Sequence, residues 1–349
     1  MKILYIGMKY DYGNPKNGFS FEHYNFYDSL IKMNGGRNEV TYFPFDELLI
    51  KYGINKMNQI LLNEVKRINP DLCFFFIFRN EIKFNTIKKI TDSGVKTFNW
   101  FSDDHWRFNV FSKYWANAFS SFSTTDKNSL EKYKKLGFKN VIKTQWGVNQ
   151  FLYKPKSSFK KYDITFIGQK YNDRAKFINV LKNAGFNVSC WGSGWSSGRV
   201  SQDEMIKIFS NSKINLNFSK SNTSLKLKTL LGFFASSNIG GELYIHNPKI
   251  IFNNIKNTID PFKMQIKGRI FEVLGSGGFL ISEYVENLSD YYKIDKEIIL
   301  FKNLLDFKKK VEYYLENEME REIVRKAGYI RSINEHTYEK RFNEIFKNI

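Results

Sequence analysis

The sequence predicts an α/β protein made of two parallel-sheet domains that face each other across a cleft. At 349 residues the chain exceeds the size at which a single hydrophobic core usually keeps growing. Short apolar runs alternate with amphipathic helical stretches, as in parallel sheets that are covered by helices on both faces. This alternation stops at a basic segment, residues 154–161, and then restarts. The same pattern occurs twice, so we expect two Rossmann-like domains.

The first domain is predicted to span residues 1–157, and its elements follow from the hydrophobic pattern. Pro70 ends a helix whose apolar residues have helical spacing, and an apolar run follows it directly. The predicted strands are residues 2–8, 40–43, 72–78 and 96–101. The predicted helices are residues 19–33, 56–68 and 82–93.

The second domain is predicted to span residues 158–335, with a polar, less regular insertion at about 219–265. A short amphipathic helix within residues 336–349 ends the chain. The predicted strands are residues 162–168, 187–191, 214–218 and 278–282. The predicted helices are residues 174–184, 201–209, 269–274, 305–315 and 318–329.

The charge balance indicates an anionic ligand. Lys and Arg number 54 against 35 Asp and Glu, a net charge of +19 that attracts phosphates, nucleic acid or acidic lipid headgroups. Cys73 and Cys190 are too few for a disulfide framework, and no apolar run approaches the ~20 residues of a membrane-spanning helix. We therefore expect a cytoplasmic protein, with peripheral contact at the inner membrane face as a further expectation from its charge.

In a parallel sheet, ligands bind beyond the carboxyl ends of the strands. Gly168 ends a predicted strand there, and Arg174 opens the next helix, where a guanidinium can clamp a phosphate. An ordinary turn between strand and helix explains the same two residues.

A second candidate lies on the predicted helix 269–274. Arg269 and Glu272 are three residues apart and so share a helix face, where a cation can meet a diphosphate and a carboxylate can accept hydrogen bonds from sugar hydroxyls. An ion pair at a helix end with a glycine stop is the alternative. Three glycines in four residues exceed the needs of one cap and favour close approach of a ligand. The full candidate set here is Lys267, Arg269, Glu272, Gly275, Gly277 and Gly278.

The catalytic candidates are Asp103, Asp104 and His105, which follow a predicted strand of the first domain. Paired carboxylates beside an imidazole can supply a general base for a hydroxyl group, whereas an Asp that caps a helix is the alternative. Gly13 and Gly18 could shape the cleft floor or belong to a plain polar loop. No metal-site spacing is present, so we expect neither metal nor cofactor.

Several motifs occur in the order found in one enzyme family. They are the run at residues 267–281, Glu297-Ile298, Tyr313-Tyr314-Leu315 with Arg321, and the run at residues 336–341. The sequence resembles the CgeB-like, group-1-type glycosyltransferases of the GT-B fold. This resemblance implies a nucleotide-sugar substrate, a UDP-sugar above others, and a last helix that crosses back to the N-terminal domain.

A more distant, motif-level similarity connects the chain with the phage DNA β-glucosyltransferases. It implies that Asp103 is the catalytic base, that Arg174 and Arg269 hold the diphosphate, and that Glu272 binds the ribose. It also implies inversion at the anomeric carbon, whereas group-1 relatives more often retain configuration, and the stereochemistry stays open.

Three functions are compatible with these patterns. The first is a glycosyltransferase that builds a cell-surface or spore-type glycan. The second keeps the chemistry but uses a hydroxymethylated base in DNA as acceptor, which the positive charge favours. The third is a nucleotide- or polyanion-binding protein without catalysis.

Overall fold

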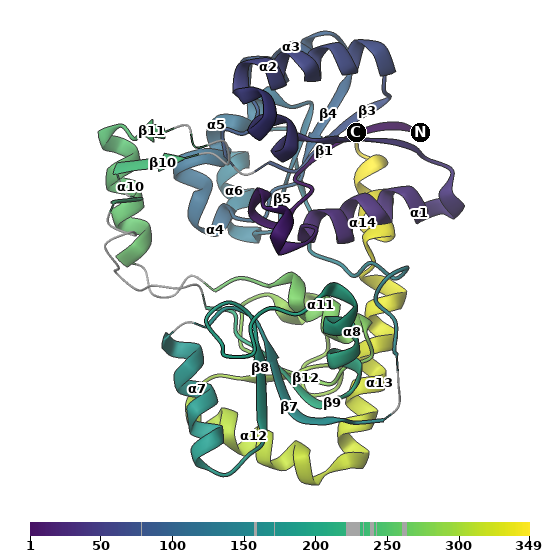
Figure 1. Cartoon of the computed structure of the whole chain (residues 1–349), viewed down its shortest axis with the longest axis vertical. Coiled ribbons are helices and arrows are strands. Elements are labelled where there is room, and N and C mark those ends of the chain that lie inside the picture. Colours follow the sequence, from purple (N-terminus) through teal and green to yellow (C-terminus); the bar gives the residue numbers. More distant parts are fainter. Residues whose placement is uncertain are drawn as a thin grey trace. The chain divides into compact units, whose positions relative to one another are not determined.

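The computed structural model of the chain divides into two compact units (Figure 1). The first unit comprises Met1–Gln145, Thr223–Lys263 and Arg341–Ile349, and the second comprises Trp146–Asn222 and Met264–Lys340. Each unit contains one large parallel sheet, which confirms the predicted α/β fold class. The structure describes residues 1–77, 79–156, 159–170, 172–220, 231–232, 234–237, 241, 243–259 and 264–349.

The first unit is built on a six-stranded parallel sheet of order β2-β1-β3-β4-β5-β6. The hydrophobic pattern predicts its first four strands, whereas β5, α6 and β6 are additions from the structure. Its strands are β1 (Lys2–Gly7), β2 (Glu39–Pro44), β3 (Leu72–Phe75), β4 (Lys96–Asn99), β5 (Ser121–Thr124) and β6 (Val141–Lys143). Its helices are α1 (Asp28–Gly36), α2 (Phe45–Ile68), α3 (Phe84–Asp92), α4 (Asp104–Arg107), α5 (Lys113–Trp115) and α6 (Lys127–Lys135).

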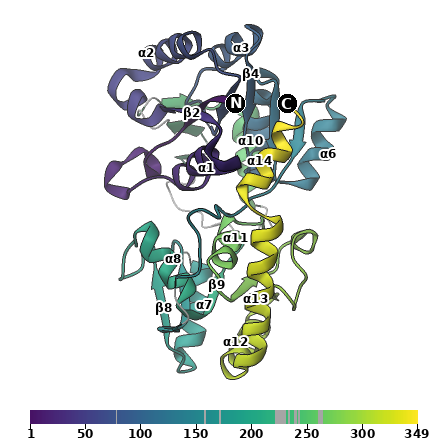
Figure 2. The ribbon, with the colours of Figure 1, turned by 90° about the vertical axis from the view of Figure 1, so that its right-hand side faces the viewer.

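The two faces of this sheet have different cores. Leu4 and Ile6 point toward a core of aliphatic and aromatic side chains that α2 and α3 complete. On the other face, Phe342 of α14 (Tyr338–Phe346) lies against Phe26 and Phe74, with ring centroids 5.6 and 5.4 Å away. The final helix thus packs beside α1 on the first sheet (Figure 2).

Part of the polar segment that the sequence assigns to the second domain groups with the first unit. It forms the hairpin β10 (Ala235–Ser237) and β11 (Leu243–Ile245), followed by α10 (Pro248–Ile259). Helix α10 contacts the π-helical turn at Phe108–Ser112, which explains why this segment belongs to the first unit. The division after Gln145 also precedes the linker expected at residues 154–161.

The second unit has a five-stranded parallel sheet of order β13-β12-β9-β7-β8. Helices α7 and α12 cover one face, and α8 and α11 cover the other. Its strands are β7 (Tyr162–Ile167), β8 (Val188–Trp191), β9 (Ser212–Asn217), β12 (Leu280–Glu283) and β13 (Ile299–Phe301). Its helices are α7 (Asn172–Asn183), α8 (Gln202–Ser210), α11 (Gly268–Gly275), α12 (Leu304–Glu316) and α13 (Glu318–Glu335).

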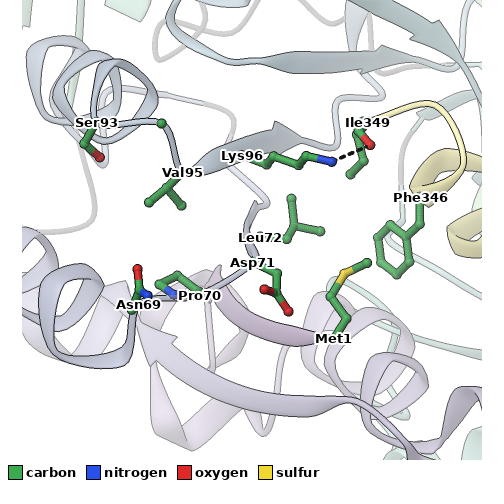
Figure 3. Close-up of a pocket in the computed structure, with 11 residues that line it drawn as sticks. Met1, Asn69, Pro70, Asp71, Leu72, Ser93, Val95, Lys96, Phe346 and Ile349 are labelled. Atoms are coloured by element: carbon green, nitrogen blue, oxygen red, sulfur yellow. Dashed lines mark hydrogen bonds between the residues drawn. The ribbon is translucent and has the colours of Figure 1, made fainter.

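A cavity of about 430 Å³ marks the amino ends of β3 and β4 in the first unit (Figure 3). It is lined by Met1, Asp71 and Phe346, and the Nζ of Lys96 donates a 2.9 Å hydrogen bond to the carbonyl of Ile349 beside it. Ligands of parallel sheets bind at the opposite, carboxyl ends.

Among the described residues, no helix is long and apolar enough to cross a membrane.

Candidate functional site

The carboxyl ends of β7, β9 and β12 bring polar groups from distant parts of the sequence to one edge of the second sheet. Gly168 follows β7, Ser219 lies just beyond β9, and Glu283 ends β12. Helices α8 and α11 each precede a strand of this sheet, so they begin at the same edge and run away from it. Their first turns therefore face the position where ligands of such sheets bind.

Helix α11 places Arg269 and Glu272 on one face, as the three-residue spacing predicts. The Nη1 of Arg269 lies 2.8 Å from the Oε2 of Glu272. The Glu272 side chain is buried, whereas that of Arg269 is 28% exposed. Arg269 also lies over the ring of Phe209, with its guanidinium carbon 5.2 Å from the centroid. The guanidinium thus covers the carboxylate and is the part that solvent can reach.

The other oxygen of Glu272 has a partner that sequence spacing does not reveal. The hydroxyl of Tyr153 donates a 2.5 Å hydrogen bond to Oε1 of Glu272, across 119 positions of the chain. The amide of Gln202, in the first turn of α8, donates to the Tyr153 hydroxyl at 2.7 Å. A buried carboxylate is costly without hydrogen-bond partners, and this network supplies them and fixes Glu272 in place.

The side chain of Arg174 connects the segments that follow β7 and β9 by hydrogen bonds. Its guanidinium donates to the carbonyl of Gln169 at 3.0 Å and to that of Phe218 at 3.3 Å. Gly168 lies beside it, and its carbonyl accepts from the indole nitrogen of Trp195 at 2.9 Å. The structure therefore brings Gly168 and Arg174 together at the carboxyl edge, in contact with backbone groups of that edge.

Glu283 is a buried carboxylate that the sequence analysis missed. Its Oε2 accepts from the backbone nitrogens of Ser219 and Lys220, at 2.9 and 3.0 Å. The Nζ of Lys220 lies 3.7 Å from its other oxygen. An acidic residue at the end of a predicted strand was the available signal, because carboxyl strand ends define the ligand edge.

The structure does not bring Gly275, Gly277 and Gly278 to that edge. They end α11 and precede β12, so they lie at the amino ends of the strands. A Cβ on Gly275 would lie 2.3 Å from the side chain of Val148, and one on Gly278 would lie 2.8 Å from the Phe209 carbonyl. Close packing explains these glycines, whereas Lys267, which precedes α11, lies at the ligand edge with Arg269.

The three catalytic candidates are consecutive but have different surroundings. Asp103 precedes α4 and is partly exposed, Asp104 is buried in its first turn, and His105 is partly exposed. All three follow β4, at the carboxyl edge of the first sheet. Of the two carboxylates, Asp103 is the one that solvent reaches.

Asp104 is held by hydroxyl groups. Its Oδ1 accepts hydrogen bonds from Ser112 and, at 3.0 Å, from Tyr133. Burial raises the pKa of Asp104 to about 7, and the hydroxyl donors offset part of that shift. These contacts explain Asp104 as a residue that joins α4 to α6.

The loop after β1 contains Gly13 and Gly18, both with positive φ, of 68° and 80°. The nitrogen of Asp11 donates to the carbonyl of Gly18 at 3.0 Å, which closes the loop on itself. Glycine tolerates this backbone conformation, so the loop geometry requires both residues. Glu22, beyond the loop, is buried and was not predicted as a candidate. Burial raises the pKa of Glu22 to about 7.

Among the residues that the structure describes, no three His, Cys, Asp or Glu side chains lie close enough together to form a metal site.

Comparisons with known proteins identify the family and the fold of the chain. Residues 174–230 and 230–347, about half of the chain, match the model of a family described as glycosyl transferase-like. This match contains Arg174, Arg269 and Glu272. No curated protein matches the sequence.

Solved glycosyltransferases share the fold. The structure of Anabaena HepE with UDP-glucose has a TM-score of 0.58 at 9% identity, over 100% of both chains. Sucrose-phosphate synthase from Thermosynechococcus elongatus has a TM-score of 0.55 at 8% identity, over 99% of this chain and 98% of that one. A variant of S. aureus TarM has a TM-score of 0.53 at 12% identity, over 83% of this chain and 58% of TarM.

These similarities confirm the expected resemblance to GT-B enzymes, whereas the similarity to the phage enzymes stays a prediction. The chain spans little more than half the length of TarM. Its family match and its pair of parallel-sheet units lead to one conclusion: the chain belongs to the glycosyl transferase-like family and has the GT-B fold.

Proposed function

We propose that this enzyme transfers a sugar from a nucleotide-sugar donor, a UDP-sugar above others, to a hydroxyl group of a glycan. The observation that carries the proposal is the Arg269–Glu272 pair, on the helix that opens at the ligand edge within the family match. The comparison structures support the donor class: HepE is described with UDP-glucose, and TarM with UDP and α-GlcNAc-glycerol.

The donor diphosphate binds at the exposed guanidinium of Arg269. Negative charge builds on the nucleoside diphosphate as its bond to the sugar breaks, and a fixed cation at a helix N-terminus stabilises that charge. Lys267 and the first turn of α11 add positive potential at the same place. Arg174 contributes its charge from the neighbouring end of β7.

Glu272 binds the ribose. Its Oε2 is covered by Arg269, so the ribose hydroxyls reach it when the guanidinium turns toward the diphosphate. Tyr153 keeps the other oxygen of the carboxylate fixed during this exchange. The ion pair is thus a resting arrangement that holds both groups ready for the donor.

Asp103 is the candidate base that removes the proton of the acceptor hydroxyl. It is partly exposed, and burial does not separate it from solvent as it separates Asp104. The family assignment supports a base of this kind only where the reaction inverts configuration. An NMR assay of the anomeric product therefore belongs with every test of Asp103.

A thermal-shift screen against UDP-, GDP-, ADP- and TDP-sugars tests the donor class, because a ligand that binds only the folded state raises the Tm. Calorimetry then compares the wild type with Glu272→Ala. We expect affinity for the best donor to fall about 10- to 100-fold, the loss of charge-assisted hydrogen bonds. Glu316→Ala, at an exposed position of α12, is the control and should bind normally. Unchanged affinity in Glu272→Ala would refute the ribose assignment.

The alternative acceptor, a hydroxymethylated base in DNA, rests on the net charge of +19. A gel shift with duplex DNA at increasing salt separates the two acceptors. Binding that persists at physiological salt would favour DNA over a glycan.

A further inference from the structure

A second cavity, of about 530 Å³, opens on the first unit. Four aromatic side chains line it, Phe84, Tyr114, Trp115 and Tyr244, together with the amides of Asn80 and Asn85. Phe84 starts α3 and Asn80 lies in the loop before it, whereas Tyr114 and Trp115 lie in α5. None of these residues belongs to the strand-end groups described above, so the cavity needs its own explanation.

The rings are arranged as a fixed wall with an accessible rim. Trp115 stacks on Phe111 at a centroid distance of 5.1 Å and meets the ring of Phe84 edge to face at 5.8 Å. Tyr114 is 46% exposed and Phe84 is 37% exposed. Tyr114 and Phe84 thus expose part of their rings at the rim of the same cavity, where an apolar face of a ligand can pack on them.

The polar segment between β9 and α11 completes this wall. Tyr244 comes from the middle of β11, and α10 holds the same segment against the π-helical turn that precedes α5 (Figure 1). A segment that departs from the regular alternation of strand and helix thus contributes a ring to the cavity. Its position in the first unit gives it a role that the sequence analysis left undefined.

The chemistry of the lining indicates a sugar. The apolar C–H faces of a pyranose pack on aromatic rings, and side-chain amides donate to and accept from neighbouring hydroxyls. Lys83 is the one side chain with a formal charge at neutral pH among the described lining residues, and it donates to Asn55. A polyanion such as DNA needs more cations than this.

We propose that this cavity binds a neutral sugar unit of the acceptor glycan, away from the hydroxyl that reacts. The inference rests on the proposed function, since it assigns the acceptor of that reaction an additional contact. Glycans long enough to occupy the cavity then bind more tightly than short ones. Tyr114 and Asn85 determine this preference and take no part in donor binding.

An array of neutral and acidic oligosaccharides, probed with the full chain, tests the proposal. Calorimetry with the strongest array ligand then compares the wild type with Tyr114→Ala and Asn85→Ala, for which we expect at least a tenfold loss of affinity. Tyr313→Ala is the matched control, because Tyr313 lies on α12 and is also 46% exposed. Each variant is checked for an unchanged Tm.

The outcomes separate this inference from the proposed function. Donor binding with glycan affinity unchanged in both variants would overturn the cavity assignment alone, as would an array without any ligand. Glycan binding that both variants lose, in a protein that binds no nucleotide-sugar, would support the cavity and contradict the proposed function. Displacement of the glycan by duplex DNA at physiological salt would identify the cavity as part of a DNA surface and overturn the inference.

Discussion

Buried carboxylates at the carboxyl edges of the two sheets can have different partners, as Glu272 and Asp104 show. In the second unit, Glu272 and Glu283 each have a cationic side chain nearby, Arg269 at 2.8 Å and Lys220 at 3.7 Å. In the first unit, Asp104 is held by the hydroxyls of Ser112 and Tyr133. The carboxyl edge of the second sheet therefore holds ion pairs. That of the first sheet holds the carboxyl group of Asp104, whose pKa burial raises to about 7.

In the proposed function, this difference corresponds to two tasks, binding of the donor diphosphate and deprotonation of the acceptor hydroxyl. An ion pair at a ligand edge can exchange partners with a diphosphate, because a bound anion takes over the cation. A buried carboxyl group that accepts hydrogen bonds from hydroxyls instead supports the backbone that carries its neighbours. Asp104 thus positions the turn in which Asp103, the proposed base, is partly exposed.

The largest expected effect is that of Asp103→Asn. Loss of a general base lowers the rate of transfer by about 10²- to 10⁴-fold, while donor affinity stays near normal. Initial rates with the best donor and acceptor, together with donor calorimetry, measure both quantities. Asp92→Asn, on the exposed surface of α3, is the control. A fully active Asp103→Asn enzyme would move the base elsewhere, to Asp104 first.

Arg269→Ala should weaken both donor binding and stability. The change leaves the buried carboxylate of Glu272 without its cation, which costs on the order of 1–3 kcal/mol and lowers the Tm. The double variant Arg269→Met/Glu272→Gln removes both charges and should recover most of the Tm but none of the donor affinity. Equal Tm values for all of these proteins would show that the pair contributes nothing to the fold.

The third prediction concerns pH. The folded pKa of Asp104, about 7, lies above the ~3.9 of an unfolded Asp. Between these values the folded state keeps a proton that the unfolded state releases, so stability falls as the pH rises toward 7, by about 1.4 kcal/mol per pH unit. Asp104→Asn keeps an acceptor for Ser112 and Tyr133 and removes this dependence.

Thermal unfolding from pH 5 to pH 8 measures the effect. The Tm of Asp104→Asn relative to the wild type should increase with pH up to about 7 and then level off, because Asp104 has then lost its proton in both states. A difference that is independent of pH would mean that Asp104 is ionised in the folded protein across this range.

The smallest expected effect is that of EDTA. Fixed guanidinium groups of Arg174 and Arg269 and the N-terminus of α11 supply the positive charge that the departing diphosphate needs. We therefore expect the transfer rate to change less than twofold after chelation. Strict dependence on added Mg²⁺ or Mn²⁺ would contradict the cation-clamp account.

Much of this architecture is predictable from the alternation of apolar runs and helical stretches. That pattern locates β1, β4, β7 and β9 to within a few residues, and the three-residue spacing pairs Arg269 with Glu272. The hydrogen bond from Tyr153 to Glu272 could not be predicted from the sequence, because the two residues are 119 positions apart and no local pattern connects them.

The glycines after α11 show a second limit of prediction from the sequence. Their density in the sequence suggests a ligand, yet a helix that precedes a parallel strand ends at the amino edge of the sheet. Gly275 and Gly278 therefore pack against Val148 and Phe209 instead. Spacing identifies which residues share a helix face, whereas topology decides which end of the helix a ligand can meet.

A crystal structure of the protein with bound UDP-glucose, or with the best sugar nucleotide from the screen, tests the central claim most directly. We predict density for the pyrophosphate against the guanidinium of Arg269, with the ribose hydroxyls on the carboxylate of Glu272 and the Arg269–Glu272 ion pair opened. A nucleotide bound elsewhere, with that ion pair intact beneath solvent, would contradict the account.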